Sequence, residues 1–259
     1  MCETCGCNVT RGNAHLAHEP VAQGTTGIDV LSRLLRANDR AAAHNRTHFD
    51  EHGTLAINLM SAPGSGKTAL LEATADALRG ELRIAVLVGD LETDNDASRI
   101  RAHGVPALQI TTGNACHLDA HLVHDALHEI RLDGVDVLFI ENVGNLVCPA
   151  SFDLGQHHDV ALLSFTEGDD KPAKYPVLFR AADLVLLTKS DLAPHMDDFD
   201  PARAERSLRA IASSAPVMAL SARRRLGLEP WLAWVRSGVR HMRQHHEGYR
   251  HDHGEAVAR

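Results

Sequence analysis

The sequence has few aromatic residues, few cysteines and no long hydrophobic run. Aromatic side chains make up 4% of its 259 residues, and no apolar stretch approaches the ~18–20 residues that a helix needs to cross a bilayer. The first seven residues have neither the basic nor the apolar region of a secretory signal peptide, which predicts a cytoplasmic protein that does not bind membranes. The formal net charge of −8 argues against binding to nucleic acid, although the 18 histidines can offset that charge in mild acid.

The five cysteines are expected to be reduced thiols that can bind metal rather than disulfides. Three of them, Cys2, Cys5 and Cys7, form C-x-x-C-x-C. Three thiolates and one terminal or backbone nitrogen give a square-planar set that suits Ni²⁺, whereas a borrowed fourth ligand gives a tetrahedral set for Zn²⁺. The alternative is an incidental cysteine-rich tail. Residues 8–26 have no apolar period and are expected to form a flexible tether.

The motif around which the rest of the chain is arranged lies at residues 55–68. An apolar run at 55–60 is followed by SAPGSGKT and then by a helical pattern, which is the strand–loop–helix context of a P-loop. In such a loop, backbone N–H groups surround phosphate oxygens, the lysine reaches the terminal phosphates, and the Thr68 hydroxyl binds Mg²⁺. Ser61 departs from the consensus, which has glycine there. The residues predicted to bind nucleotide in this segment are Gly64, Ser65, Gly66, Lys67, Thr68 and Ala69.

Six further apolar runs predict the other strands of a doubly wound, mostly parallel, seven-stranded sheet of the α/β class. They lie at residues 83–90, 107–111, 135–141, 160–166, 184–191 and 217–222. Because ligands bind at the carboxyl ends of such strands, Asp90 is expected to bind Mg²⁺ or to position the attacking water. Asp96 in the following helix either supports that carboxylate or only complements the helix dipole.

The run at 135–141 ends in an acid that is followed by a glycine three residues later. This pattern is similar to the Walker B and third GTPase motifs, with Glu141 in place of the usual aspartate. Gly144 is expected to present its N–H group to the γ-phosphate, a contact that is lost on hydrolysis. The predicted catalytic residues are therefore Lys67, Asp90, Glu141 and Gly144.

The run at 184–191 ends in T-K-x-D, which is similar to the guanine signature N-K-x-D. In that signature the aspartate, here Asp191, accepts hydrogen bonds from guanine N1 and N2, and the stem of the lysine, here Lys189, covers the ring. Thr188 replaces the asparagine. Ser221 and Ala222 end the last predicted strand and are expected to lie behind the base. The predicted nucleotide is therefore GTP.

Cys116 and His117 precede a predicted helix, whose positive N-terminal end favours a thiolate. A Cys-His pair needs a further ligand to form a metal site, and Cys148 lies four residues beyond Gly144. A thiolate so close to a phosphate-sensing loop can move with the nucleotide, so Cys148 is the candidate third ligand. The alternative is a buried structural cysteine. The predicted helix also aligns histidines in a stripe that faces solvent or another subunit: His117, His121, His124 and His128. A hydrated helix face is the expected role of all of them except His117.

The chain is predicted to divide into three parts: a metal-binding motif with its tether at 1–26, the P-loop domain at 27–240, and a histidine-rich tail at 241–259. The domain is expected to begin with a helix that ends near residue 43. The tail has too few apolar residues to fold, and either it is only solvated or it buffers metal weakly.

Together, these motifs resemble the HypB hydrogenase-maturation GTPases. The resemblance rests on C-x-x-C-x-C, SAPGSGKT, GDLETDNDASRI, the Cys116-His117 pair, ENVGNLVCP, TEGDDKPAKYP and TKSD. It implies GTP hydrolysis, a homodimer promoted by GTP, and delivery of nickel through an accessory protein to the large subunit of [NiFe] hydrogenase. It also implies a nickel site at the N-terminal cysteines and a nickel or zinc site near the dimer interface, formed by Cys116, His117 and Cys148. Many relatives carry a dense histidine run before the P-loop, and that run is thin here.

Three other functions are consistent with parts of the sequence. A storage or buffering protein for nickel or zinc would bind many ions weakly. A urease-type nickel GTPase shares the fold but lacks the N-terminal cysteines and has a Cys-Pro-His motif, whereas Ala150 follows Cys148-Pro149 here. An ATP-dependent small-molecule kinase would prefer ATP to GTP.

Overall fold

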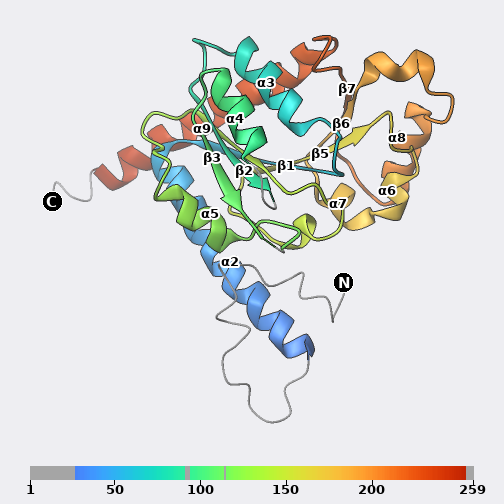
Figure 1. Ribbon diagram of the computed structural model, residues 1–259. Helices are drawn as coiled ribbons and strands as arrows, with labels where there is room; N and C mark the ends of the chain where they lie inside the picture. The colour runs from blue at the N-terminus through green and yellow to red at the C-terminus, as the bar shows by residue number, and fades with distance from the viewer. Residues whose placement is uncertain (1–26, 91–93, 114, 255–259) are drawn as a thin grey trace.

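The centre of the molecule is a single sheet of seven strands in the order β3-β2-β4-β1-β5-β6-β7 (Figure 1). The computed structural model describes residues 27–90, 94–113 and 115–254. All neighbouring strands are parallel, which confirms the predicted doubly wound α/β architecture. The strands are β1 (Leu55–Ser61), β2 (Ile84–Asp90), β3 (Ala107–Thr111), β4 (Val137–Glu141), β5 (His158–Ser164), β6 (Leu184–Thr188) and β7 (Val217–Ala219).

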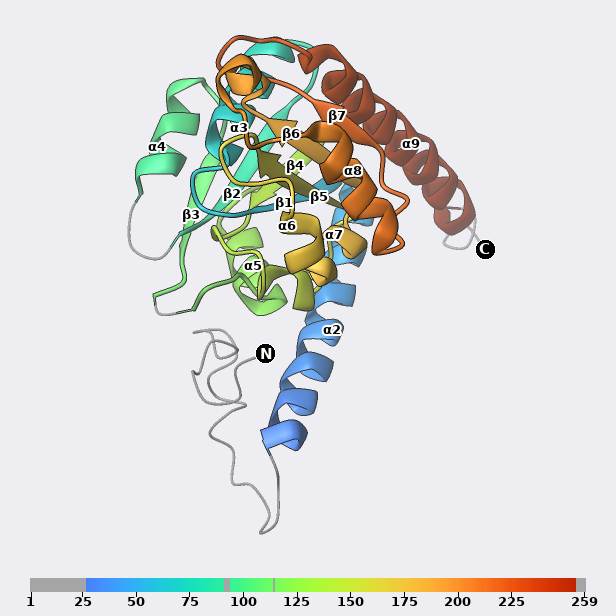
Figure 2. The same cartoon turned by 90° about the vertical axis from the view of Figure 1, so that its right-hand side faces the viewer.

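Helices cover both faces of this sheet (Figure 2). One face is covered by α3 (Lys67–Ala77), α4 (Asn95–Ala102) and α9 (Leu228–Gly254). The other is covered by α2 (Gly27–His52), α5 (Ala120–Leu127), α7 (Pro176–Ala181) and α8 (Pro201–Ala210). The short α6 (Lys171–Lys174), η1 (Pro149–Ser151) and η2 (Ser190–His195) lie in connections. Among the described residues, no helix is long and apolar enough to cross a membrane.

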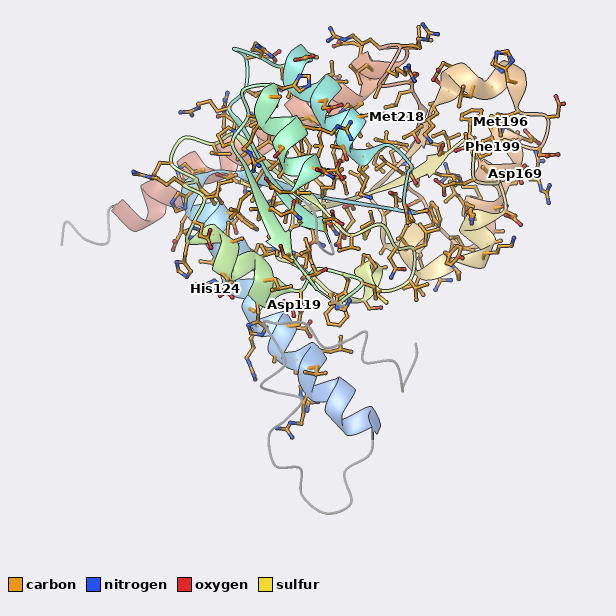
Figure 3. All side chains as sticks on the ribbon, in the orientation of Figure 1. Asp119, His124, Asp169, Met196, Phe199 and Met218 are labelled. Atoms are coloured by element: carbon orange, nitrogen blue, oxygen red, sulfur yellow. The ribbon has the colours of Figure 1, made fainter. Side chains whose placement is uncertain are left out.

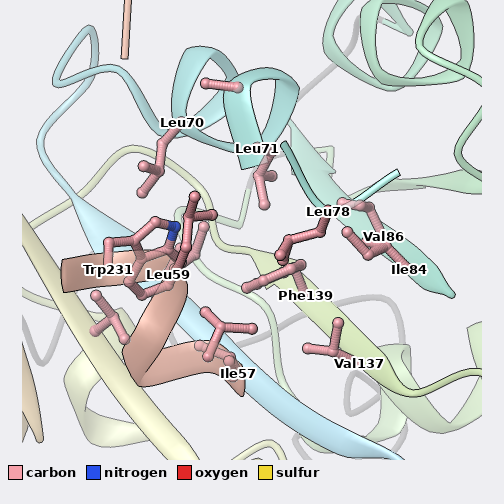
Figure 4. Close-up of a cluster of buried hydrophobic side chains, with 14 of the residues drawn as sticks. Ile57, Leu59, Leu70, Leu71, Leu78, Ile84, Val86, Val137, Phe139 and Trp231 are labelled. Carbon is pink, nitrogen blue, oxygen red and sulfur yellow. The ribbon is translucent and has the colours of Figure 1, made fainter. Parts of the chain in front are cut away.

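The strands are apolar along their length because they are buried on both faces. In β1, Leu55, Ile57 and Leu59 point toward α3 and α9, whereas Ala56 points toward α2 and α5. Figure 4 shows the buried apolar cluster between the sheet and helices α3 and α9, which includes Phe139 and Trp231. Burial of each large apolar side chain stabilises the fold by roughly 1.5–3 kcal/mol.

The parallel register brings the functional ends of the strands to one edge of the sheet. Glu141 at the end of β4 lies opposite Leu59 of β1 and Val88 of β2. Strand β1 therefore leads into the P-loop beside Glu141, and Asp90 at the end of β2 lies on the same edge. This is the edge at which open parallel sheets bind ligands.

The helix that begins the domain is longer than predicted. Helix α2 continues to His52 rather than ending near residue 43. Phe49 is fully buried against the sheet, and the Asn45 side-chain amide donates hydrogen bonds of 2.8 and 3.1 Å to the carbonyl oxygens of Ala120 and Leu154. These tertiary contacts hold the polar second half of α2 in place.

The histidine-rich tail, which the sequence analysis predicted not to fold, is helical as far as Gly254. Met242 in this part of α9 is buried in the core. Arg243 donates a 2.8 Å hydrogen bond to the carboxylate of Asp136, and His246 Nδ1 lies 3.0 Å from the carbonyl oxygen of Asp50. Contacts with distant segments therefore compensate for the low apolar content of the tail.

Candidate nucleotide and metal sites

The P-loop connects β1 directly to α3. Gly66 has a φ of 97°, a conformation that glycine adopts without strain, and α3 begins at the next residue. Lys67 Nζ donates a 3.0 Å hydrogen bond to Ser61 Oγ, which in turn donates to the carbonyl oxygen of Ala62 at 2.7 Å. Ser61, the residue that departs from the P-loop consensus, thus provides an acceptor for the buried ammonium group.

Two buried ionisable groups of opposite charge belong to this site. Burial lowers the pKa of Lys67, and Glu141 is foremost among the carboxylates that oppose this effect. Burial raises the pKa of Glu141 to about 7, although Lys67 and the hydrogen bond from Thr68 oppose the rise. Thr68 Oγ1 donates to Glu141 Oε1 at 2.9 Å, and Glu141 Oε2 is buried without a hydrogen-bond partner among the described residues. Such an oxygen can accept a cation or a water molecule.

A cavity of about 440 Å³ lies over the P-loop and the ends of β2 and β4. Of the residues predicted to act here, it is lined by Gly64, Gly66, Lys67, Thr68, Ala69, Asp90, Asp96, Glu141 and Gly144. A Cβ atom added to Gly144 would lie 2.9 Å from Pro63 Cα, so only glycine allows this segment to approach the P-loop so closely.

Two residues of this region were not identified from the sequence. Arg99 lines the cavity while it binds Glu72 at 2.9 Å and Asp96 at 3.0 Å. Its position three residues after Asp96 on α4 was the available signal. Glu167 accepts a 2.5 Å hydrogen bond from Ser65 Oγ and so connects the loop after β5 to the P-loop.

A second cavity, of about 330 Å³, adjoins the first through Gly66 and Ala69. It brings together the residues predicted to recognise guanine and the adjoining part of the P-loop: Ser65, Lys189, Asp191, Ser221 and Ala222. Thr188, which replaces the asparagine of the signature, donates a 2.7 Å hydrogen bond from Oγ1 to the carbonyl oxygen of Ser65. It thereby joins the end of β6 to the P-loop. Lys189 has a φ of 59°, which ends the strand earlier than predicted.

Cys116, His117 and Cys148 lie together although they come from separate connections, before α5 and before η1. The two Sγ atoms are 3.1 Å apart, Cys116 Sγ is 4.0 Å from His117 Nδ1, and potential ligand atoms of all three lie within 4.8 Å of one another. Burial lowers the pKa of His117 to about 4, so its imidazole is neutral at neutral pH. Its Nε2 is buried without a hydrogen-bond partner among the described residues. Two thiols and a neutral imidazole form a donor set suited to Zn²⁺ or Ni²⁺.

The segment after β4 touches both sites. Gly144 packs against Pro63 of the P-loop, and the absence of a Cβ atom allows this close approach. Asn145 Nδ2 donates a 3.2 Å hydrogen bond to the carbonyl oxygen of Cys116, and Asn145 Oδ1 accepts one of 2.8 Å from the backbone of Val147. Cys148 follows, with its sulfur beside that of Cys116. The segment from Gly144 to Cys148 therefore lies against both the P-loop and the thiol pair.

The predicted histidine stripe is wrong at its first member. His117 precedes α5, which begins at Ala120 with Asp119 as its N-cap, and His117 is fully buried and stacked on Phe152 with ring centroids 4.1 Å apart. His124 is only partly exposed to solvent, because it lies beside α2 (Figure 3). The predicted N-terminal ligands Cys2, Cys5 and Cys7 lie outside the described residues.

The sequence is similar to those of known hydrogenase maturation factors. A family model described as "CobW/HypB/UreG, nucleotide-binding domain" matches residues 55–219. The hydrogenase maturation factor HypB of Azotobacter chroococcum mcd 1 is 50% identical over 220 residues, which cover 85% of this chain and 72% of the relative. That of Escherichia coli (strain K12) is 45% identical over 230 residues, which cover 86% and 79%.

Solved structures agree with this assignment. The crystal structure of HypB from Helicobacter pylori in complex with nickel has a TM-score of 0.75 and 40% identity, and covers 79% of this chain and 96% of that chain. The structure of hydrogenase maturation factor HypB from Archaeoglobus fulgidus has a TM-score of 0.74 and 38% identity, and covers 79% and 100%. The chain therefore belongs to the CobW/HypB/UreG family of nucleotide-binding proteins and, within it, to the HypB hydrogenase maturation factors.

Proposed function

We propose that this chain is a GTP-hydrolysing nickel carrier that delivers nickel during maturation of [NiFe] hydrogenase. In this proposal GTP promotes a homodimer that holds nickel, and hydrolysis releases the metal to an accessory protein and then to the hydrogenase large subunit. The observation that carries the proposal is the physical continuity from Gly144, against the P-loop, to Cys148, beside Cys116.

The choice of GTP is supported by the second cavity. Asp191 is the carboxylate that can accept hydrogen bonds from guanine N1 and N2, and Lys189 lines the same cavity. The adenine ring presents an acceptor at N1 and no amino group at C2, so it cannot satisfy that carboxylate. A site that hydrogen-bonds an N–H group of its ligand discriminates strongly against an analogue that lacks this group.

Hydrolysis is assigned to the residues of the first cavity. Mg²⁺ prefers oxygen ligands, and the cavity offers three: Thr68 Oγ1, the Asp90 carboxylate and Glu141 Oε2, which has no hydrogen-bond partner among the described residues. This donor set fits the ion. Bound Mg²⁺ supplies positive charge to the phosphate oxygens. Lys67 holds the terminal phosphates, and Asp90 either binds the ion or positions the attacking water. Gly144 donates its N–H group to the γ-phosphate. Without an arginine supplied by a partner, turnover is expected near ~10⁻⁴–10⁻² s⁻¹.

Nickel is assigned as the cargo of Cys116, His117 and Cys148, and Zn²⁺ is the alternative ion for the same ligands. Support comes from the soft donor set and from the Helicobacter pylori relative, whose structure is described as a complex with nickel. Metal binding requires deprotonated thiols and a neutral imidazole, and burial already keeps His117 neutral. The cysteines at positions 2, 5 and 7 are proposed as a separate nickel site.

Coupling between the sites follows from the shared segment. When γ-phosphate is lost, the Gly144 N–H group loses its acceptor and the segment relaxes. Asn145 then shifts relative to the Cys116 carbonyl, and Cys148 moves away from Cys116. Loss of one thiolate weakens the site, so hydrolysis favours transfer of the ion.

Titration of the full chain with Ni²⁺ and with Zn²⁺ tests this proposal. Wild-type protein and Cys2→Ala are each measured with GDP and with a non-hydrolysable GTP analogue. The proposal predicts few tight sites, one of which is lost in Cys2→Ala and another of which binds more tightly with the analogue. Many weak sites that ignore the nucleotide would instead indicate storage, and preference for ATP with phosphorylation of an acceptor would indicate a kinase.

A further inference from the structure

We infer that His44 of α2 together with His124 and His128 of α5 forms a second binding site for a divalent transition-metal ion on the surface of the domain. This cluster, the α2–α5 histidine cluster, comes from two helices that pack against each other. Figure 3 places His124 on α5 where that helix lies beside α2. The inference concerns side chains that neither the nucleotide cycle nor the Cys116 site uses, and it does not rest on the proposed function.

The geometry of His124 and His128 is already that of a chelating pair. Their Nε2 atoms lie 3.3 Å apart, with the two rings edge to face. Two nitrogens bound to one ion at ~2.0–2.1 Å in a tetrahedral site lie about 3.3 Å apart. The spacing of the two nitrogens therefore suits an ion in place of the single proton that a neutral histidine–histidine hydrogen bond holds.

A third imidazole comes from the neighbouring helix. The ring centroid of His44 lies 5.0 Å from that of His124, again edge to face. His44 and His128 are exposed and His124 is half-buried, so an ion can reach the cluster from solvent while one ligand is fixed by packing. Ligands from two helices distinguish this cluster from an ordinary pair four residues apart on one helix.

The surroundings of His124 favour its neutral imidazole, which is the form that binds metal. Burial and then the nearby His128 and His44 lower the pKa of His124, against an opposing effect of Asp125. The pKa of His48, one turn from His44, is lowered by burial and by the neighbouring histidines, with Glu51 opposing. Imidazole ligands suit Zn²⁺, Cu²⁺ and Ni²⁺, and the net charge of −8 attracts cations to the protein.

Calorimetric titration of the full chain with Ni²⁺ alone tests the inference. The variant His124→Ala/His128→Ala is expected to bind one equivalent fewer than the wild type. His44→Ala and the exposed single change His128→Ala are each expected to weaken that equivalent at least ~10-fold. The same losses are expected when Cys116 and Cys148 are both replaced by serine, so the test is independent of the proposed carrier site. Thermal melting verifies that each variant is folded.

The matched control is His241→Ala/His245→Ala. These two histidines are also four residues apart on one helix, with ring centroids 4.4 Å apart. This variant is expected to retain the equivalent that His124→Ala/His128→Ala loses. Equal losses in the two double variants would mean general histidine binding, and no loss in His124→Ala/His128→Ala or in His128→Ala would mean that the cluster holds only a shared proton. Either result overturns the inference.

Discussion

Strand β4 has a buried carboxylate at each end, and the two carboxylates are treated in opposite ways. Asp136, just before the strand, is 9% exposed at its side chain and accepts hydrogen bonds from the backbone of Arg83 at 2.8 Å and from Arg243 at 2.8 Å. Burial acts to raise the pKa of Asp136, but these hydrogen bonds outweigh it and lower the pKa. Glu141, at the other end, keeps one oxygen without a hydrogen-bond partner among the described residues, and burial raises its pKa to about 7.

One carboxylate therefore serves stability and the other is available for function, although only five positions separate them along the chain. Asp136 accepts hydrogen bonds from Arg83, just before β2, and from Arg243 of α9, and so it fastens the helical tail to the sheet. Glu141 shares a cavity with a buried lysine and a threonine hydroxyl. Its Oε2, which has no hydrogen-bond partner among the described residues, is available to a ligand. Incompletely satisfied, buried ionisable groups in a cavity are typical of functional sites.

The largest effect is expected when the site at the Glu141 end of β4 loses the ammonium group of Lys67. Lys67→Ala is predicted to lower the hydrolysis rate by roughly 10³-fold because the terminal phosphates lose their buried ammonium partner. Glu141 is then expected to stay protonated at neutral pH, since Lys67 opposes the rise in its pKa. Single-turnover hydrolysis measures the loss. The control is Lys174→Ala, an exposed lysine paired with Asp170, and a similar loss in the control would refute the assignment.

Removal of the thiol that follows the functional end is the next test. Cys148→Ser is predicted to weaken Ni²⁺ binding at the domain site by about 100-fold, because a soft thiolate ligand is replaced by a hydroxyl. Cys116→Ser is expected to give a similar loss, since the two sulfur atoms face each other at 3.1 Å. Competition with a chelator of known affinity measures both. A loss in one variant without the other would contradict a shared ion.

Nucleotide selectivity is expected to change by a smaller factor. Asp191→Asn is predicted to reduce the preference for GTP over ATP by roughly 10–100-fold, since hydrogen bonds to a charged group contribute about 1.5–3 kcal/mol. Competition binding with the two nucleotides measures the ratio. Asp197→Asn, a change of the same type at an exposed position of the same connection, is the control. Unchanged selectivity in Asp191→Asn would remove the guanine assignment.

The smallest effect is expected at the structural end of β4. Asp136→Asn is predicted to lower the free energy of unfolding by about 1–2 kcal/mol at neutral pH, through weaker hydrogen bonds to the two arginines. Because the folded-state pKa of Asp136 is lowered, its stabilisation is present above the unfolded-state value of ~3.9 and is lost as the pH falls through the folded value. Denaturant unfolding at neutral and at acidic pH tests this. A difference that persists in strong acid would contradict the pairing.

The sequence was sufficient for features that depend on short, contiguous patterns. The seven strands follow from apolar runs, and the P-loop follows from SAPGSGKT, because a strand buried on both faces and a phosphate loop each leave a local signature. Cys148 was expected to join Cys116 because it lies four residues beyond Gly144, and the two Sγ atoms lie 3.1 Å apart. The helical end of α9 could not be predicted, since it depends on Met242 and Arg243 meeting distant residues.

Other features were missed for the same physical reason. The second half of α2 is polar, and tertiary contacts such as the burial of Phe49 and the hydrogen bonds of Asn45 make it part of the fold. His117 fits the helical period of α5, but Asp119 caps that helix and leaves His117 outside it. The meeting of His44 with His124 depends on the packing of two helices, for which no pattern along the chain is diagnostic.

The central claim is that the γ-phosphate and the thiol pair act on one segment of backbone. The affinity of the domain site for Ni²⁺ should be measured with GDP and with a non-hydrolysable GTP analogue, in the wild type and in Asn145→Ala, which loses the hydrogen bond to Cys116. Tighter binding with the analogue, by about 5-fold or more, in the wild type and a much smaller ratio in Asn145→Ala are the predicted results. Equal affinities with the two nucleotides in the wild type would contradict the claim.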